Sequence, residues 1–365
     1  MLKRAGSELK EIHHPSHGFS YLFLIIFATM IRIGIIGLGY WGPNLVRNFN
    51  AAEGAEVTIV SDFEQDRLDK ICSQYPHVIG VKDGAEIINS TEVDAVVLAT
   101  PIKTHYTLAK QALNAGKHVL VEKPLTTSAE EGKELIALAE SKGKVIMVDH
   151  TFLYTGAVKK IKELVESGEI GDLQYFDSTR INLGLFNPNW SVAWDLAVHD
   201  LSIFDYISGG KQAVSVSATG ISHTNLSIED ISYITLHFSD KTIVHITSSW
   251  ISPVKIRSTL IGGTKKMVIY DDVEPTEKIK IYDSGFSVQD PEEMHRFLVD
   301  YRFGDIHIPK IAQTEALLGV ANDFISAIEN GTIPISNAQT GLRVVAILEA
   351  AEKSMKQKGA VISLK

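Results

Sequence analysis

The chain is poor in cysteine and lacks any cluster of positive charge. Its 365 residues include one cysteine, Cys72, and its formal net charge is −9. A single thiol excludes an intrachain disulfide and a cysteine-rich metal site, so we interpret Cys72 as a small, partly buried residue and expect a reducing, cytoplasmic environment. Lysine and arginine form no basic stripe, which neutralisation of a nucleic-acid backbone requires, so we expect no nucleic-acid partner.

A long apolar run is also lacking. The run Tyr21–Met30 is too short to cross a bilayer, so we expect no membrane partner. Lys3 and Arg4 precede it, as in a secretory signal, but no small-x-small cleavage site follows and the run merges into the next strand. We therefore expect residues 1–29 to be a poorly ordered extension, with the first domain beginning at residue 30.

From residue 30 to residue 150, short apolar runs alternate with helix-like segments. Apolar runs without polar alternation are typical of strands buried on both faces of a parallel sheet. The expected strands are Ile31–Ile36, Val57–Val60, Val78–Val81, Ala95–Ala99, His118–Val121 and Val145–Val148. The expected helices are Asn44–Ala52, Gln65–Gln74, His105–Ala115 and Ala129–Ser141. The alternation predicts an α/β domain with a doubly wound parallel sheet.

The pattern changes after residue 150. Turn residues separate apolar runs that partly alternate with polar residues, as in antiparallel hairpins. These runs are Leu173–Leu183, Val214–Thr219, Ile231–Phe238, Thr242–Ser249, Lys255–Ile261 and Lys266–Tyr270. Helices are expected at Gly156–Glu166, 314–330 and 338–355. Residues 151–365 are therefore predicted to form an α+β domain with a largely antiparallel sheet.

A glycine motif follows the first predicted strand. Gly37, Gly39 and Gly42 form G-x-G-x-x-G, with Tyr40 and Trp41 inside it. The first glycine allows a tight turn, the second lets the backbone approach a pyrophosphate, and the third lets the next helix pack on the strand. The free N–H groups at that helix N-terminus favour an anion. The motif predicts dinucleotide binding.

An acidic residue identifies the expected dinucleotide. Asp62 ends the second predicted strand, and a carboxylate there binds the ribose hydroxyls and repels a 2′-phosphate. A purely structural glycine turn would not explain this acid. No arginine immediately follows Asp62, so we expect NAD rather than NADP. Thr100, Pro101, His105 and Glu122 complete the predicted cofactor site, although Thr100-Pro101 also fits a simple turn.

Two motifs contain candidate catalytic residues. Lys123, in Glu122-Lys123-Pro124, follows the fifth predicted strand at the edge where cofactor and substrate would meet, and its ammonium could polarise a substrate oxygen. Asp195 and His199 are four residues apart, so on a helix the carboxylate could orient the imidazole as a general base. A solvated loop lysine and a helix-surface ion pair are the alternatives. No third spaced ligand accompanies them, so we expect no metal.

The order and spacing of IGIIGLGYWG, ATP (Ala99–Pro101), EKP (Glu122–Pro124) and DLAVHD (Asp195–Asp200) resemble the Gfo/Idh/MocA oxidoreductase family. The resemblance extends from about Ile31 to the C-terminus. It implies that Lys123, Asp195 and His199 line the site where the nicotinamide meets the substrate. It also implies that the second domain builds a homodimer or homotetramer.

Two further segments resemble the branch of the family that acts on UDP-sugars, similar to UDP-N-acetylglucosamine or UDP-N-acetylglucosaminuronate 3-dehydrogenases. They are HTFLYTGAV (His150–Val158) and DSTRINLGLF (Asp177–Phe186). Arg180 and Asn182 share one face of a predicted strand, where the guanidinium could hold a carboxylate or phosphate, or simply be a surface cation. Tyr154 could contact substrate or pack. With Lys123, Asp195 and His199, these residues form the predicted substrate site.

These observations predict an enzyme that oxidises a secondary hydroxyl of a sugar carried by UDP and passes the hydride to NAD. Three alternatives stay open. The substrate could be a free sugar or inositol, the reaction could be NAD-dependent glycoside hydrolysis, or the chain could be a non-catalytic NAD-binding regulator.

Overall fold

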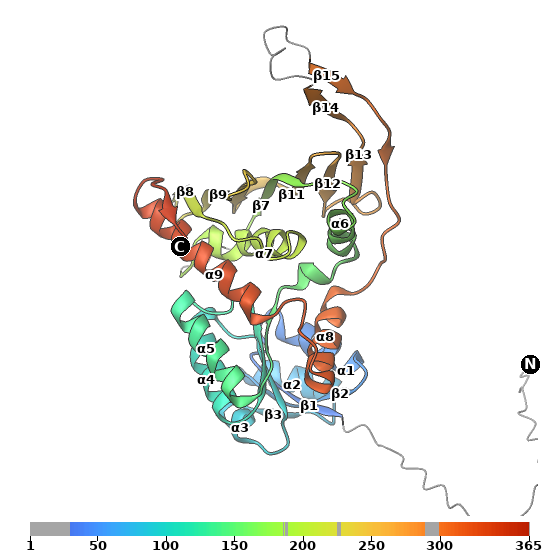
Figure 1. Cartoon of the computed structure of the whole chain (residues 1–365). Helices are drawn as coiled ribbons and strands as arrows, with labels where there is room; N and C mark the ends of the chain where they lie inside the picture. Colours follow the sequence, from blue (N-terminus) through green and yellow to red (C-terminus); the bar gives the residue numbers. More distant parts are fainter. Residues whose placement is uncertain (1–29, 185, 187–188, 225–227, 289–298, 365) are drawn as a thin grey trace, which may run out of the picture.

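The computed structural model describes residues 30–184, 186, 189–224, 228–288 and 299–364. The extension expected at residues 1–29 lies outside these residues. Within them, two main sheets and their helices form the body of the molecule, and the chain crosses from one half to the other more than once (Figure 1).

The first half contains a six-stranded parallel sheet in the order β3-β2-β1-β4-β5-β6. Chain order reverses between β1 and β4, and ligands of such sheets bind at this switch, beyond the carboxyl ends of the strands. The strands are β1 (Ile31–Ile36), β2 (Ala55–Ser61), β3 (Ile79–Val81), β4 (Ala95–Leu98), β5 (His118–Glu122) and β6 (Ile146–Asp149). The helices are α1 (Gly42–Ala51), α2 (Gln65–Gln74), α3 (Gly84–Asn89), α4 (His105–Asn114) and α5 (Ala129–Lys142).

The second half contains a nine-stranded sheet in the order β16-β13-β12-β11-β7-β10-β9-β8-β17. Among the described strands of this sheet, the pair β7–β10 is parallel and the other pairs are antiparallel. Its strands are β7 (Leu173–Leu183), β8 (Ser215–Ile221), β9 (Ile231–His237), β10 (Ile243–Ser249), β11 (Ile251–Gly263), β12 (Met267–Asp271), β13 (Ile279–Tyr282), β16 (Ile306–His307) and β17 (Ile362–Ser363). The predicted fold class, a Rossmann sheet followed by a largely antiparallel sheet, is confirmed.

The helices of the second half differ in what they cover. Helices α6 (Gly156–Glu166) and α7 (Val198–Ile207) lie on the side of the nine-stranded sheet that faces the first half (Figure 1). Helix α8 (Ala316–Asn330) returns to α1, where the Phe324 and Phe49 rings lie 6.3 Å apart. Helix α9 (Ala338–Lys356) contacts both halves, because Glu349 accepts from the N–H of Ala129 and Arg343 pairs with Asp205.

Several elements were not predicted. Helix α3 is short and begins at Asp83, whose carboxylate accepts the N–H of Ala85. Strands β13, β16 and β17 are also short, and a separate pair, β14 (Gly285–Val288) and β15 (Val299–Arg302), projects from the body (Figure 1). Elements of this length carry too few apolar residues for a periodic pattern to be recognised.

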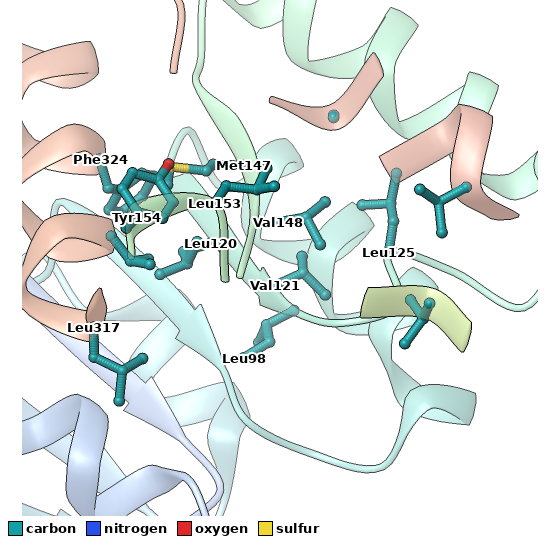
Figure 2. Close-up of a cluster of buried hydrophobic side chains, with 14 of the residues drawn as sticks. Leu98, Leu120, Val121, Leu125, Met147, Val148, Leu153, Tyr154, Leu317 and Phe324 are labelled. Carbon is teal, nitrogen blue, oxygen red and sulfur yellow. The ribbon is translucent and has the colours of Figure 1, made fainter. Parts of the chain in front are cut away.

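The core beside the sheet junction includes Tyr154, which was a predicted substrate contact. Figure 2 shows its ring among Met147, Leu153 and Phe324. The side chain is buried, and its hydroxyl donates to Asp323 Oδ2 at 2.7 Å and lies 2.9 Å from Ser336 Oγ. Of the two roles considered for Tyr154, these contacts support packing rather than substrate binding.

Among the described residues, no helix is long and apolar enough to cross a membrane.

Candidate active site

The glycine motif forms a tight loop between β1 and α1. Gly37 has a φ of 98°, and a Cβ there would lie 2.5 Å from the carbonyl oxygen of Ala99. A Cβ at Gly42 would lie 2.2 Å from the carbonyl oxygen of Gly37, so helix and turn pack without room for a side chain. A Cβ at Gly39 would meet nothing within 4 Å. The loop is therefore closed towards the protein and open at Gly39, as binding of a pyrophosphate requires.

In the first turn of α1, Pro43 has no N–H, and the N–H of Asn44 donates to the Trp41 carbonyl oxygen at 3.0 Å. Trp41 precedes the helix and makes no side-chain cap hydrogen bond. The Tyr40 and Trp41 rings meet edge to face at 5.2 Å, and Tyr40 is largely exposed. Both aromatic side chains thus border the open side of the loop, where their contact with a cofactor stays a prediction.

The Asp62 carboxylate lies directly beside this loop. Its Oδ2 accepts the N–H of Leu38 at 2.7 Å, and its Oδ1 accepts the N–H of Glu64 at 2.9 Å. Arg67 Nη1 lies 3.2 Å from Oδ2. Partial burial raises the pKa of Asp62, but these two N–H donors and the guanidinium outweigh burial, so the pKa lies below its usual value. Asp62 is ionised at neutral pH, and Arg67 is a neighbour that the sequence analysis did not identify.

His105 joins two turns at the carboxyl edge of the sheet. One ring nitrogen lies 2.8 Å from the carbonyl oxygen of Thr100 and the other 2.9 Å from that of Pro124. The ring is buried, and burial lowers its pKa. The structure therefore assigns His105 a supporting contact behind Thr100 and Pro101, while its predicted contact with a cofactor has no support from these distances.

Beneath Lys123 lies a buried pair of acids. Glu122 at the end of β5 and Asp149 at the end of β6 are register neighbours, and both are buried. Thr151 donates its hydroxyl to Asp149 at 2.6 Å. Burial and the neighbouring Asp149 raise the pKa of Glu122 well above its usual value. Burial also raises the pKa of Asp149, and two neighbouring buried carboxyl groups cannot both ionise readily, so the pair as a whole retains a proton more strongly than ordinary carboxyl groups do.

Lys123 reaches across to the second half of the molecule. Its Nζ donates to Asp195 Oδ1 at 3.1 Å and to the Asp195 carbonyl oxygen at 3.0 Å. The indole of Trp250 donates to the other carboxylate oxygen of Asp195 at 3.1 Å. The Lys123 side chain is 14% exposed and that of Asp195 is 42% exposed. The two predicted catalytic residues thus meet at a partly open position, and Trp250 is a third member that the sequence analysis missed.

Asp195 does not hold His199 in the way the four-residue spacing suggested. Within the described residues, no hydrogen bond joins them, and His199 Nδ1 is buried without a partner. Asp195 lies in a π-helical turn, Ala193–Ala197, which precedes α7. Such a turn contains more residues than an α-helical one, so residues i and i+4 no longer lie above each other. The carboxylate is directed to Lys123 and Trp250 instead.

His199 is surrounded by an aromatic ring and by cations. The Phe152 ring lies 4.9 Å from the imidazole, and the Arg180 guanidinium lies 4.6 Å from the Phe152 ring centre. Burial lowers the pKa of His199 well below its usual value, and the charges of Lys123 and Arg180 lower it further. The imidazole is therefore neutral at neutral pH.

The Arg180 guanidinium binds a carboxylate with two hydrogen bonds, and this carboxylate is the side chain of Asp200 rather than a substrate group. Its Nε and Nη2 donate to the two oxygens of Asp200 at 2.8 and 2.9 Å, and both side chains are almost fully buried. This bidentate pair joins β7 to α7 next to His199. The burial of Arg180 does not fit the alternative of a surface cation, and its predicted contact with substrate stays a prediction. Asn182 is half-buried on the same face of β7, and its predicted contact with substrate stays a prediction.

No metal centre is formed by the described part of the chain, which contains no group of three or more His, Cys, Asp or Glu side chains placed to hold an ion. The site is instead defined by a dinucleotide loop, a lysine–aspartate contact between the two halves and a partly buried, neutral histidine. The glycine loop, Asp62 and Lys123 all lie at the carboxyl edge of one parallel sheet. This is the arrangement of a nicotinamide-dependent oxidoreductase.

Comparison with known proteins agrees with this geometry. A 34% identical relative, an uncharacterised oxidoreductase of Escherichia coli, aligns with 45% of this chain and 46% of its own length. An NADP-dependent scyllo-inositol 2-dehydrogenase of Bacillus subtilis is 24% identical over 91% of this chain and 96% of its own. The solved structure of a UDP-N-acetylglucosamine 3-dehydrogenase from Acidithiobacillus ferrooxidans superposes with a TM-score of 0.76 and 22% identity, covering 90% of this chain and 98% of the other. At that identity the likeness shows the fold alone.

Two family models match successive segments. Residues 31–150 match an oxidoreductase family with an NAD-binding Rossmann fold, and residues 158–269 match the GFO/IDH/MocA C-terminal domain. Since the two models match in order and agree with the two sheets of the structure, the chain belongs to the Gfo/Idh/MocA family of NAD-binding oxidoreductases.

Proposed function

We propose that the protein oxidises a secondary hydroxyl of a sugar, and that the sugar is carried by UDP. The observation that carries this proposal is the contact of Lys123 from the first half with Asp195 from the second, next to the neutral His199. When bound, the nicotinamide supplies the hydride acceptor. The protein residues position the substrate hydroxyl and manage its proton.

Lys123 is proposed to stabilise negative charge on the reacting oxygen. Its ammonium is held by two contacts with Asp195, yet the side chain keeps some exposure. Trp250 fixes the far oxygen of that carboxylate and so fixes the lysine indirectly. A cation held in place before reaction lowers the barrier because it does not have to reorganise as charge develops.

His199 is proposed to accept the hydroxyl proton. A neutral imidazole can act as a base, whereas a protonated one cannot. Its surroundings keep it neutral. Phe152 and the Arg180–Asp200 pair hold its position, in place of the carboxylate contact that the sequence pattern suggested.

The cofactor is proposed to be NAD, because the Asp62 carboxylate is ionised beside the loop where a ribose would lie. The proposal of a UDP-sugar substrate is based on the two sequence segments described above. The Acidithiobacillus protein whose solved structure has the same fold is a UDP-N-acetylglucosamine 3-dehydrogenase. A second candidate is an inositol, because the Bacillus relative that aligns over most of the chain is an inositol dehydrogenase that uses NADP. We also propose a homodimer or homotetramer.

The first experiment follows absorbance at the NADH band with purified protein and NAD. The substrates are a panel of UDP-sugars, the corresponding free sugars and inositols, each with and without 2-oxoglutarate to reoxidise the cofactor. We expect NADH with one UDP-sugar. Reduction only with an inositol or free sugar would discard the UDP-sugar while keeping the chemistry, and no reduction with any compound would contradict the proposed oxidation.

A further inference from the structure

Lys103 makes a second polar contact between the two halves of the molecule. This residue lies in a 3₁₀-helical turn, Ile102–Thr104, that follows β4. Its Nζ donates to Asn189 Oδ1 at 2.8 Å and lies 5.8 Å from the centre of the Trp190 ring. Both partners precede the π-helical turn of the second half. Because an amide and an indole are uncharged, they hold the ammonium without neutralising it.

The aromatic partner of Lys103 is itself fixed by the second half. Trp190 is half-buried, and its ring lies 5.8 Å from the ring of Trp194. Trp194 is buried, and its indole N–H donates to Glu352 Oε2 on α9 at 3.2 Å. Lys103 and Asn189 are both exposed. The ammonium is therefore held in a defined position and stays accessible to a ligand.

Lys103 lies at the same edge of the parallel sheet as Lys123. The two lysines follow β4 and β5, which are hydrogen-bonded neighbours. Neighbouring strands lie about 5 Å apart, and ligands bind beyond their carboxyl ends. In the second half, the ring of Trp194 contacts Trp190, and the next residue is Asp195, which pairs with Lys123. A substrate whose hydroxyl reacts beside Lys123 would therefore bring a group several bonds away to Lys103.

We propose that Lys103 binds the diphosphate of a nucleotide-sugar substrate and so selects that substrate class. An ammonium has three N–H donors, of which Asn189 accepts one, so two can donate to phosphate oxygens. Hydrogen bonds between an ammonium and a phosphate are charge-assisted and stronger than neutral ones. A free sugar or an inositol has no anionic group to place there. The inference rests on the proposed function, because it names the residue that recognises the UDP part of its substrate.

The test is direct binding of UDP, which needs no knowledge of the sugar. UDP is titrated calorimetrically into the purified full chain in saturating NADH. We expect the wild type to bind UDP, and Lys103→Gln to raise the Kd for UDP about tenfold, because charge-assisted hydrogen bonds are lost. The Kd for NADH, measured by nucleotide fluorescence, should change by less than about threefold, which also shows that the variant is folded.

Two further variants separate the charge of the site from its shape. Asn189→Asp places a carboxylate beside the Lys103 ammonium with little change in side-chain size, so it should also raise the Kd for UDP about tenfold. Lys110→Gln is the matched control, because Lys110 is an accessible lysine of the same half that pairs with Glu134. This control should leave the Kd values for UDP and NADH unchanged.

Three outcomes would overturn the inference, and they differ in what else they contradict. An unchanged Kd for UDP in Lys103→Gln would overturn the inference alone and leave the proposed function standing. Equal weakening of UDP and NADH would assign Lys103 to the cofactor site instead. A wild type that binds NADH but not UDP would contradict the UDP-sugar of the proposed function together with the inference. Binding of UDP through Lys103 without oxidation of any UDP-sugar would count only against the proposed reaction.

Discussion

At the scale of single residues, the site depends on how its charged groups are paired. The Lys123 ammonium pairs with Asp195 and the Arg180 guanidinium pairs with Asp200, whereas His199 forms no ion pair with any described residue. Each cation near His199 is thus neutralised locally, but their combined field still disfavours an imidazolium. The candidate site therefore combines the Lys123 cation with a neutral imidazole, the two groups that the proposed oxidation would use.

Removing either reactive side chain should reduce turnover with little effect on folding. Lys123→Ala and His199→Ala should each lower kcat about a hundredfold, the usual effect of losing acid–base catalysis. Since the pKa of His199 is lowered, the acidic limb of kcat/KM should lie below pH 6.5, because the base is lost only when pH falls through the lowered pKa. Steady-state kinetics measure both effects, with His237→Ala on β9 as an exposed control. Near-normal turnover would remove the residue from the mechanism.

Substitution of Arg180 distinguishes a structural role of this residue from a role in substrate binding. Arg180→Ala leaves the buried Asp200 without its partner, so the free energy of unfolding should fall by about 3–5 kcal/mol. Urea denaturation followed by circular dichroism measures the change. A variant of normal stability that instead shows only a raised KM would return Arg180 to the substrate site as the strand pattern suggested.

At the scale of elements, the ends of β5 and β6 place an unusual set of buried polar groups under the lysine. Glu122 and Asp149 end adjacent strands, and His150 follows Asp149 with both ring nitrogens buried and without hydrogen-bond partners among the described residues. Burial, assisted by the Lys123 charge, lowers the pKa of His150 to about 3. These two strand ends therefore place the lysine near a carboxyl pair that retains a proton and an imidazole that stays neutral.

His150 should make stability depend on pH. Its pKa is about 3 in the folded protein and about 6.5 when unfolded, so the unfolded chain binds the proton first as pH falls. The contribution of His150 to stability is present above pH 6.5 and declines towards pH 3. The stability difference between wild type and His150→Gln should therefore shift by about 2 kcal/mol against the wild type between pH 6.5 and pH 5.

Urea unfolding of both proteins at several pH values measures this shift. The comparison cancels the contributions of the other buried groups, including Glu122, whose raised pKa acts in the opposite direction. A difference that stays constant with pH would show that His150 is accessible to protons in the folded state.

At the scale of the whole molecule, the two sheets are joined by helices that come from the end of the chain. Helix α9 contacts α5 through Glu349 and α7 through Arg343, and α8 contacts α1. The predicted boundary near residue 150 thus describes where the sheets divide, but residues 316–356 also pack on the first half. This arrangement brings Lys123 after β5 and Asp195 in the π-helical turn, which belong to different halves of the molecule, to a 3.1 Å contact.

The outer face of the nine-stranded sheet is where we expect self-association. Tyr233 and Ile243 are exposed apolar residues on this sheet, and Figure 1 shows α6 and α7 on its other side. Light scattering should give the mass of a dimer or tetramer for the wild type, and Tyr233→Lys with Ile243→Lys should lower it. Ile333→Lys changes an apolar residue that is exposed elsewhere and serves as the control. A monomeric wild type would contradict the expected oligomer.

The sequence pattern by itself determined those parts of the protein that depend on interactions between residues close together in the chain. The apolar runs predicted the parallel sheet because a strand buried on both faces has no polar alternation. The glycine spacing predicted the loop because Gly37 needs a positive φ and Gly42 leaves no room for a Cβ. Lys123 was placed at the carboxyl edge because it follows a buried strand.

Tertiary structure decided the pairings. Arg180 lies 20 residues before Asp200, Asp195 meets Trp250 across 55 residues, and Arg67 turns back to Asp62 from the next helix. Hydrophobic periodicity reports which face of an element is buried, but it contains no information on which polar group of another element faces it there. The π-helical turn at Ala193–Ala197 shows the same limit, because a single extra residue in a turn redirected Asp195 from His199 to Lys123.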